Sequence, residues 1–369
     1  MTLPETLFKS RIPCATVSTF GRHPAAFFYR GWDRIMQPHE PEGPEYTDLF
    51  TQEQKEQHDH LFNPQYEGMQ TVRGEEVVRV ASDWLENNVE GDFFLHVHLW
   101  DPHTPYDPPE EDLELFRDTP RNPYPTDEQL PAVSSPAGRT SEGMQKLMTH
   151  YDAGIHYADR QIGRLLERCE ELGLVEETVF IVTSDHGEEF GERRLCCEHG
   201  SVYEGTARIP LIVSGPGIDP GASQALVTNV DRAPTVAGLF GIPAPGEWQG
   251  SDLAALLEGP DGSVREELVV SHAVYNSQRA LVRGRHKLVR TYRGGHSGRR
   301  PGLELFDLHE DPYEQHDLSD REPEVTVEMA NGLGGWVEQV LNGRPDPVLQ
   351  RLHEPHWFEP SLEKRQGYE

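Results

Sequence analysis

One short segment of this chain combines a carboxylate and an imidazole directly after an apolar run. Asp185 and His186 follow the run 178–184 and precede Gly187. Together they could hold a divalent cation: carboxylate oxygens favour Ca²⁺ or Mg²⁺, and an imidazole nitrogen also admits Zn²⁺ or Mn²⁺. The same residues also fit a strand-ending turn capped by the aspartate. The local sequence leaves both interpretations open.

A second segment, HLWDPHTPYDPP, contains a histidine between prolines. Pro102 and Pro105 restrict the loop around His103, and a rigid loop at a strand end can present a proton donor. His96 and His98 alternate in the preceding run and therefore point to one face, where we favour a hydrogen-bonded core pair over metal ligands. His199, in the segment EHGSVYEG, indicates little by itself.

Strands and helices alternate in the part of the chain that carries these residues. Apolar runs predict buried strands at 13–20, 93–100, 178–184 and 208–214, with no element before the first. Apolar spacing near 3.6 residues predicts helices at 74–88 and 141–172. The apolar stripe of the second helix comprises Met148, Tyr151, Ile155, Ala158, Ile162 and Leu166.

This alternation predicts an α/β fold with a doubly wound mixed or parallel sheet and helices on both faces. Ligands of such folds bind at the carboxyl ends of the strands, where the two polar segments lie. We predict one α/β domain over 1–260, a small C-terminal α+β subdomain of short antiparallel strands over 261–345, and a tail over 346–369.

The composition narrows the classes of partner. The chain has 369 residues, with 33 Lys and Arg against 63 Asp and Glu, a net charge of −30. Such a charge disfavours nucleic acid as a binding partner, because its phosphate backbone would be repelled. The scarcity of lysine is typical of a halophilic protein. No apolar run approaches the roughly 20 residues that span a bilayer, so we expect no membrane partner. The absence of a signal-peptide pattern predicts a cytoplasmic location. The oligomeric state is left open.

Taken together, the motifs resemble the sulfatase family of the alkaline phosphatase superfamily. DPHTPY, SDHGEE and YEGTARIPLIVSGPG occur in the order typical of that family. TNVDRAPTVAGLFGIPAPGEWQGSDLAALLEG, HKLVRTY and LELFDLHEDPYEQHDL extend the resemblance over roughly residues 90–320. The resemblance implies an alkaline-phosphatase-like fold and a metal-dependent sulfuric ester hydrolase acting on a small-molecule or carbohydrate sulfate ester.

The resemblance also implies roles for four residues. Asp185 and His186 match the second pair of calcium ligands, and His103 matches the histidine that contacts the sulfate and assists the leaving group. His199 falls where the family has a lysine or histidine that binds a sulfate oxygen. Cationic donors and a metal ion would neutralise the charge that develops on the transferring sulfuryl group.

The family's paired aspartates and its C/S-x-P-x-R motif, which yields the formylglycine nucleophile, have no counterpart. Cys14 precedes Ala15 and Thr16 in a predicted buried strand, so we reject it as nucleophile. We therefore expect the N-terminal nucleophile segment of a sulfatase to be missing. Two alternatives stay open: a phosphodiesterase, phosphonate hydrolase or phosphoryl transferase of the same superfamily, and a catalytically inactive sulfatase-like binding protein.

Overall fold

The structure is a computed structural model that describes residues 1–19, 30–38, 72–88, 90–103, 106–119, 141–191, 196–259, 261–273, 276–293 and 302–350. These residues belong to two compact units. The first unit consists of Met1–Pro120, Met148–Ile181 and Ile212–Val264, and the second consists of Arg121–Leu147, Val182–Leu211 and Arg265–Glu369. The domain boundary at residue 260 stays a prediction, and residues 351–369 of the predicted tail lie outside the described part.

A parallel sheet organises the first unit. Its strands β1 (Cys14–Ser18), β2 (Arg34–Met36) and β3 (Phe94–His98) lie in the order β2-β1-β3, with Ala15 opposite Leu95. Two further strands, β4 (Phe180–Thr183) and β7 (Leu211–Ser214), pair with each other. The predicted parallel sheet is therefore confirmed, and the strand β2 is an element that the sequence pattern did not reveal.

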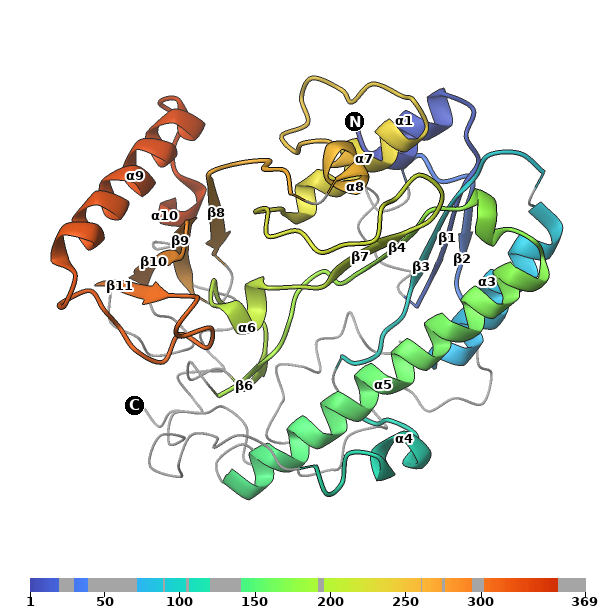
Figure 1. Cartoon of the computed structure of the whole chain (residues 1–369), viewed down its shortest axis with the longest axis horizontal. Helices are drawn as coiled ribbons and strands as arrows, with labels where there is room; N and C mark the ends of the chain where they lie inside the picture. Colours follow the sequence, from blue (N-terminus) through green and yellow to red (C-terminus); the bar gives the residue numbers. More distant parts are fainter. Residues whose placement is uncertain are drawn as a thin grey trace. The chain divides into compact units, whose positions relative to one another are not determined.

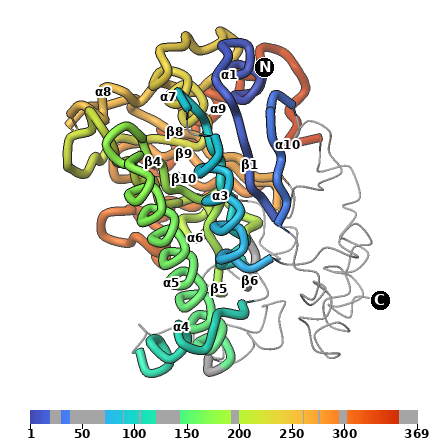
Figure 2. Tube along the Cα trace, turned by 90° about the vertical axis from the view of Figure 1, so that its right-hand side faces the viewer, coloured from blue at the N-terminus to red at the C-terminus, as the bar shows by residue number. Residues whose placement is uncertain are grey.

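Helices cover both faces of this sheet. The long helices α3 (Gly74–Asn88) and α5 (Ser141–Glu171) lie side by side in Figure 1 and Figure 2, and their residues Trp84 and Cys169 pack with Ala15. On the opposite face, Cys14 packs with α1 (Leu3–Lys9) and α7 (Arg232–Leu239). Successive residues of a strand point to opposite faces, so neighbouring Cys14 and Ala15 enter separate cores.

Two expectations for the helices are wrong. Helix α1 precedes the first strand, and a capping box in which Thr2 and Glu5 bond each other's backbone stabilises its first turn. In α5 the buried face is not the predicted one: Ile155 is 45% exposed, whereas Tyr157 is 1% exposed. The buried face includes Gln161, a polar residue that a search for apolar spacing passes over.

An antiparallel sheet forms the core of the second unit. Strands β8 (Glu267–His272), β9 (Ser277–Arg283), β10 (His286–Arg293) and β11 (Gly302–Asp307) lie in the order β11-β10-β9-β8. Leu281, Leu288 and Leu305 pack against α9 (Pro323–Leu341), and the opposite face carries Ala280, Val289 and Phe306. The predicted short antiparallel strands are confirmed.

The remaining elements are short. A small antiparallel ribbon joins β5 (Glu189–Phe190) to β6 (Cys196–Glu198) in the second unit. The other helical turns are α4 (Glu110–Glu114), η5 (Val175–Glu177), α6 (Glu204–Ala207), η6 (Asn229–Asp231), α8 (Ala254–Glu258) and α10 (Pro347–Gln350).

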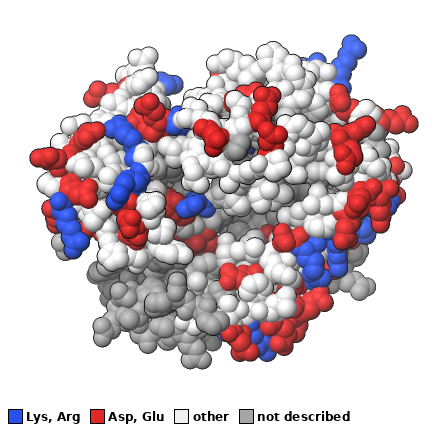
Figure 3. Space-filling view, viewed as in Figure 1, with Lys and Arg blue, Asp and Glu red and all other residues white. Residues whose placement is uncertain are grey.

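The acidic surface retains many local ion pairs. Figure 3 shows acidic and basic side chains interspersed over one face of the molecule, and Arg79, for example, bonds both Glu76 and Asp83 on α3. Exposed pairs of this kind contribute little to stability, about 0–1 kcal/mol each. None of the helices in the described ranges is long and apolar enough to cross a membrane.

Candidate active site

Asp185 and His186 follow the end of β4 and form a contacting pair. The His186 backbone N–H donates to Asp185 Oδ1 at 3.0 Å, and His186 Nδ1 lies 2.9 Å from the carbonyl oxygen of Gly187. A carbonyl oxygen only accepts, so this bond assigns the proton to Nδ1 and leaves the lone pair of a neutral ring on Nε2. That atom lies 3.5 Å from Asp185 Oδ2. Two acceptors facing each other fit a proton or a cation between them.

His199 stacks directly on His186. The two ring centroids are 3.7 Å apart and the rings are inclined by 16°. Glu188 Oε1 lies 3.8 Å from His199 Nδ1, and the Glu188 side chain is 6% exposed. Two charged imidazoles at this separation would repel each other, whereas a charged ring on a neutral one is attractive. Each ring thus has one carboxylate beside it, Asp185 for His186 and Glu188 for His199.

Two glycines allow the backbone segments around these histidines to approach closely. A Cβ on Gly187 would lie 2.2 Å from the carbonyl oxygen of Gly205, so a side chain does not fit. The Gly187 N–H instead donates to the Thr206 carbonyl oxygen at 2.8 Å. The buried Glu189 accepts bonds from the Ser201 and Thr206 hydroxyls. The segment that carries His186 is thereby fixed to the one that follows His199.

The loop that carries His103 follows β3 in the first unit. The His103 backbone N–H donates to the Trp100 carbonyl oxygen at 2.9 Å, and the centroid of the His103 ring lies 4.1 Å from that of Trp100. Further along, Arg73 bonds Asp107 at 3.2 Å and His150 Nδ1 lies 3.0 Å from the Tyr106 carbonyl oxygen. The described parts of the loop are thus held by α5 and by the residue before α3, while residues 104 and 105 lie outside the described part.

Asp101, two residues before His103, is a carboxyl group in an unfavourable environment. Desolvation raises its pKa to about 6, against the opposing effects of the Arg73 charge and of backbone hydrogen bonds that include the Gly74 N–H. Its neighbour Tyr157 accepts a bond from the Glu75 N–H at 3.1 Å, and burial raises the tyrosine pKa to about 12. Asp101 therefore connects the His103 loop to the start of α3.

Two other sequence expectations concern β1 and β3. His96 Nδ1 lies 3.0 Å from the Thr16 hydroxyl and His98 Nδ1 lies 2.9 Å from the Ser18 hydroxyl, with the two rings stacked. The two histidines are hydrogen-bonded as predicted, but His96 is exposed and His98 half-buried, so the pair does not belong to the core. Cys14 is fully buried, and desolvation raises the pKa of its thiol to about 12. A buried protonated thiol is a poor nucleophile, in agreement with its rejection.

The residues predicted to hold a metal supply part of a coordination shell. Asp185 and His186 offer one carboxylate and one imidazole nitrogen, while Ca²⁺ takes 6–8 oxygen ligands. Within the described ranges, no group of three or more His, Cys, Asp or Glu residues could enclose an ion. The pair fits a divalent cation as two of its ligands and does not complete its shell.

The four residues predicted for the site fall into two groups. Asp185, His186 and His199 contact one another in the second unit, and His103 belongs to the first, so its meeting with the other three stays a prediction. The sequence motifs assign no role to Glu188 or Asp101. Both lie within the motifs SDHGEE and DPHTPY, and their position beside the predicted histidines was the available signal.

Comparisons with known proteins assign the chain to a family. A family model described as Sulfatase matches residues 33–242, more than half of the chain, and one described as N-sulphoglucosamine sulphohydrolase, C-terminal, matches residues 191–335. Choline-sulfatase from Rhizobium meliloti (strain 1021) is 30% identical over 253 residues, which cover 64% of this chain and 48% of that protein. An endo-4-O-sulfatase from Bacteroides thetaiotaomicron is 28% identical over 272 residues, covering 67% of this chain and 52% of that protein. The chain spans about half the length of these two relatives.

Solved structures support the predicted alkaline-phosphatase-like fold. BT4656, determined in complex with its substrate D-glucosamine-2-N,6-O-disulfate, superposes with a TM-score of 0.71 and 19% identity, covering 94% of this chain and 83% of that one. The phosphonate monoester hydrolase of Agrobacterium radiobacter gives a TM-score of 0.67 and 17% identity, covering 91% of this chain and 80% of that one.

Proposed function

Because the chain belongs to the sulfatase family, we propose that it serves in the hydrolysis of sulfate esters. The observation that carries this proposal is the stack of His186 and His199 after β4, with Asp185 beside one ring and Glu188 beside the other. This arrangement offers a pair of metal ligands and a cationic donor within one short stretch of chain.

Each residue has a chemical task in this proposal. His199, beside Glu188, would donate a hydrogen bond to a sulfate oxygen and stabilise the negative charge of the sulfuryl group. His103 would give a proton to the leaving oxygen of the ester. Cys14 is buried with a raised thiol pKa, so we do not assign it as the nucleophile.

Sulfatases generally use a divalent cation. We propose that Asp185 and His186 hold it here, with Ca²⁺ as the first choice and Mg²⁺, Mn²⁺ or Zn²⁺ as alternatives. The lone pair of His186 Nε2 and the Asp185 carboxylate face each other as two ligands would. A bound cation would add positive charge next to the sulfuryl oxygens.

The proposed substrate class is a small-molecule or carbohydrate sulfate ester. A choline-sulfatase and an endo-4-O-sulfatase are among the relatives of similar sequence, and a structural neighbour was solved with a sulfated glucosamine. Hydrolysis of choline sulfate, an aryl sulfate and sulfated glucosamine by the native protein, followed as released inorganic sulfate in Ca²⁺, tests the proposal. Turnover of any of them supports it. Binding without turnover would instead support the inactive-binder alternative.

A second candidate is hydrolysis of phosphonate or phosphate esters. The structural similarity to a phosphonate monoester hydrolase supports this second candidate, since a phosphonate ester resembles a sulfate ester in its tetrahedral shape and negative charge. Competition between matched aryl sulfate and aryl phosphonate substrates separates the two candidates. A kcat/KM higher for the phosphonate would contradict the sulfatase proposal.

A further inference from the structure

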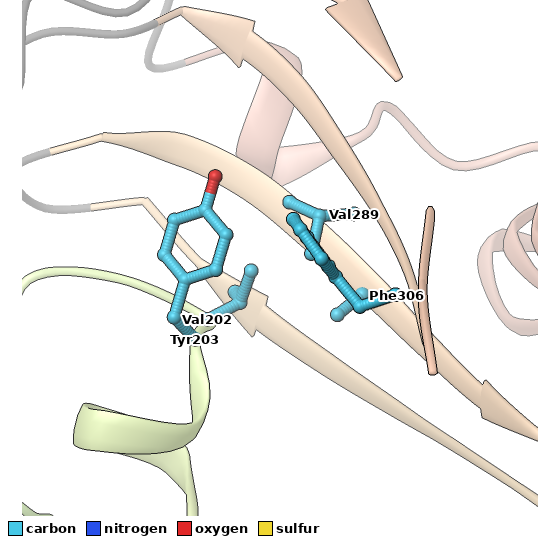
Figure 4. Packing of buried hydrophobic residues seen from close by; sticks show 5 residues of the cluster. Val202, Tyr203, Val289 and Phe306 are labelled. Carbon is cyan, nitrogen blue, oxygen red and sulfur yellow. The ribbon is translucent and has the colours of Figure 1, made fainter. Parts of the chain in front are cut away.

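The segment that directly follows His199 is anchored to the antiparallel sheet of the second unit. Val202 and Tyr203 pack against Val289 and Phe306, as Figure 4 shows, and the Tyr203 hydroxyl donates to Glu304 Oε2 at 2.5 Å. These contacts join residues about a hundred positions apart in the chain. The segment is therefore held by the sheet rather than by its own local structure.

A buried ion cluster holds the end of the same segment. Lys287 is fully buried, with Nζ 2.7 Å from Glu204 Oε1 and 3.0 Å from Glu314 Oε1. Glu314 also accepts the Glu204 backbone N–H at 2.7 Å. Separating a buried ion pair destabilises the folded protein strongly, because each charge is left without a partner. The contact with Lys287 therefore keeps Glu204 in place in the folded state.

Gly200 is the residue at which this anchored segment meets His199. A glycine backbone reaches more conformations than any other residue, so a free Gly200 would let His199 rotate relative to the residues after it. Its carbonyl oxygen accepts a bond from Asn276 Nδ2 at 2.7 Å. Asn276 is 3% exposed and lies immediately before β9. This bond fixes the peptide group between Gly200 and Ser201 and so limits the rotation of the backbone at Gly200.

We infer that Asn276 is a positioning residue for His199, holding the Gly200 peptide so that the His199 ring stays stacked on His186 and faces the sulfate. The inference rests on the proposed function of His199 as a sulfate-binding cation. His199 keeps 29% of its side chain exposed, so an anion can reach it while its main chain is fixed. The C-terminal sheet thereby contributes to the site without supplying a residue that touches substrate.

The stacking of the two rings gives a direct test. Imidazole ¹H–¹³C NMR spectra of the chain, assigned with His186→Gln and His199→Gln, report the ring-current shift that each histidine induces in the other. Asn276→Ala and Asn276→Asp both remove the Nδ2 donor, and the aspartate keeps the side-chain volume if the alanine variant does not fold. We expect both variants to lose at least half of the mutual shift and to bind inorganic sulfate about tenfold more weakly.

Asp346→Asn is the matched control. It weakens the buried ion pair in which Arg279, on strand β9, bonds Asp346 at 2.6 and 2.8 Å. Neither of these two bonds involves residues 199–204. We expect this variant to lower the melting temperature but to keep the ring shifts and the sulfate affinity. Unchanged ring shifts in both Asn276 variants, or an equal loss in Asp346→Asn, would overturn the inference.

The two proposals fail in different ways in this experiment. If the unmodified chain shows the stacking shifts, and these fall in the Asn276 variants, the positioning role stands whatever sulfate does. If inorganic sulfate shifts neither histidine at millimolar concentration with Ca²⁺ present, the proposed function of His199 is contradicted instead.

Discussion

Asp101 gives a quantitative prediction for stability. Desolvation raises its pKa from 3.8 to about 6 in the folded protein, so between these values the folded state keeps a proton that the unfolded state has lost. The free energy of unfolding therefore falls as pH rises from about 4 to 6, and it then levels off. At about 1.36 kcal/mol per pKa unit, the shift of the Asp101 pKa from 3.8 to about 6 corresponds to a loss of about 3 kcal/mol in the free energy of unfolding.

The substitution Asp101→Asn removes this titration and keeps an oxygen that can accept the Gly74 N–H. We expect the unfolding free energy of the wild-type chain, relative to the variant, to fall by about 2.5 kcal/mol between pH 4 and 7.5, because part of the unfolded Asp101 is already ionised at pH 4. Urea unfolding at half-unit pH intervals measures it, and the difference cancels titrating groups that the two proteins share. Asp107→Asn, in an exposed pair with Arg73, is the matched control with an expected effect below about 1 kcal/mol. A wild-type-to-variant difference that stays constant over this pH range would refute the reasoning.

Four further variants test the site and its support. Lys287→Met leaves two glutamates unneutralised in a buried place and should lower the unfolding free energy by about 3–5 kcal/mol in urea unfolding at pH 7.5. His103→Ala should lower kcat of the native protein for its sulfate ester by about 10²–10⁴-fold, and unchanged turnover would exclude its role as proton donor. Asp185→Asn should weaken Ca²⁺ binding in isothermal titration, whereas equal affinity would remove it as a ligand. Gly187→Ala places a methyl group against the Gly205 carbonyl oxygen, so the melting temperature should fall, and an unchanged value would contradict the close contact.

The sequence predicted the elements whose pattern is regular and whose burial is strong. Helix α3 has the predicted limits, Gly74 to Asn88, because Val77, Ala81 and Trp84 recur on one face. The three-residue strand β2 is too short to show a period and is mostly exposed, so only its pairing with β1 defines it. Helix α1 carried a signal that was passed over, the Thr2–Glu5 capping box.

The sequence could predict which residues belong to the site but not how their side chains lie relative to one another. Motif resemblance identified Asp185, His186 and His199, but twelve intervening residues separate the two histidines, and their stacking depends on how that stretch folds. The Asn276 bond to Gly200 joins residues 76 positions apart, and no local pattern encodes such a pairing. Long-range contacts of this kind arise only from the assembled core.

A crystal structure of the native protein grown with CaCl₂ and an unreactive sulfate analogue tests the central claim most directly. We predict a cation bonded to Asp185 and His186 Nε2, and a sulfate oxygen within hydrogen-bond distance of His199, with His103 on the side of the ester oxygen. A sulfate bound away from His199, or a cation that contacts neither Asp185 nor His186, would contradict the assignment of this site.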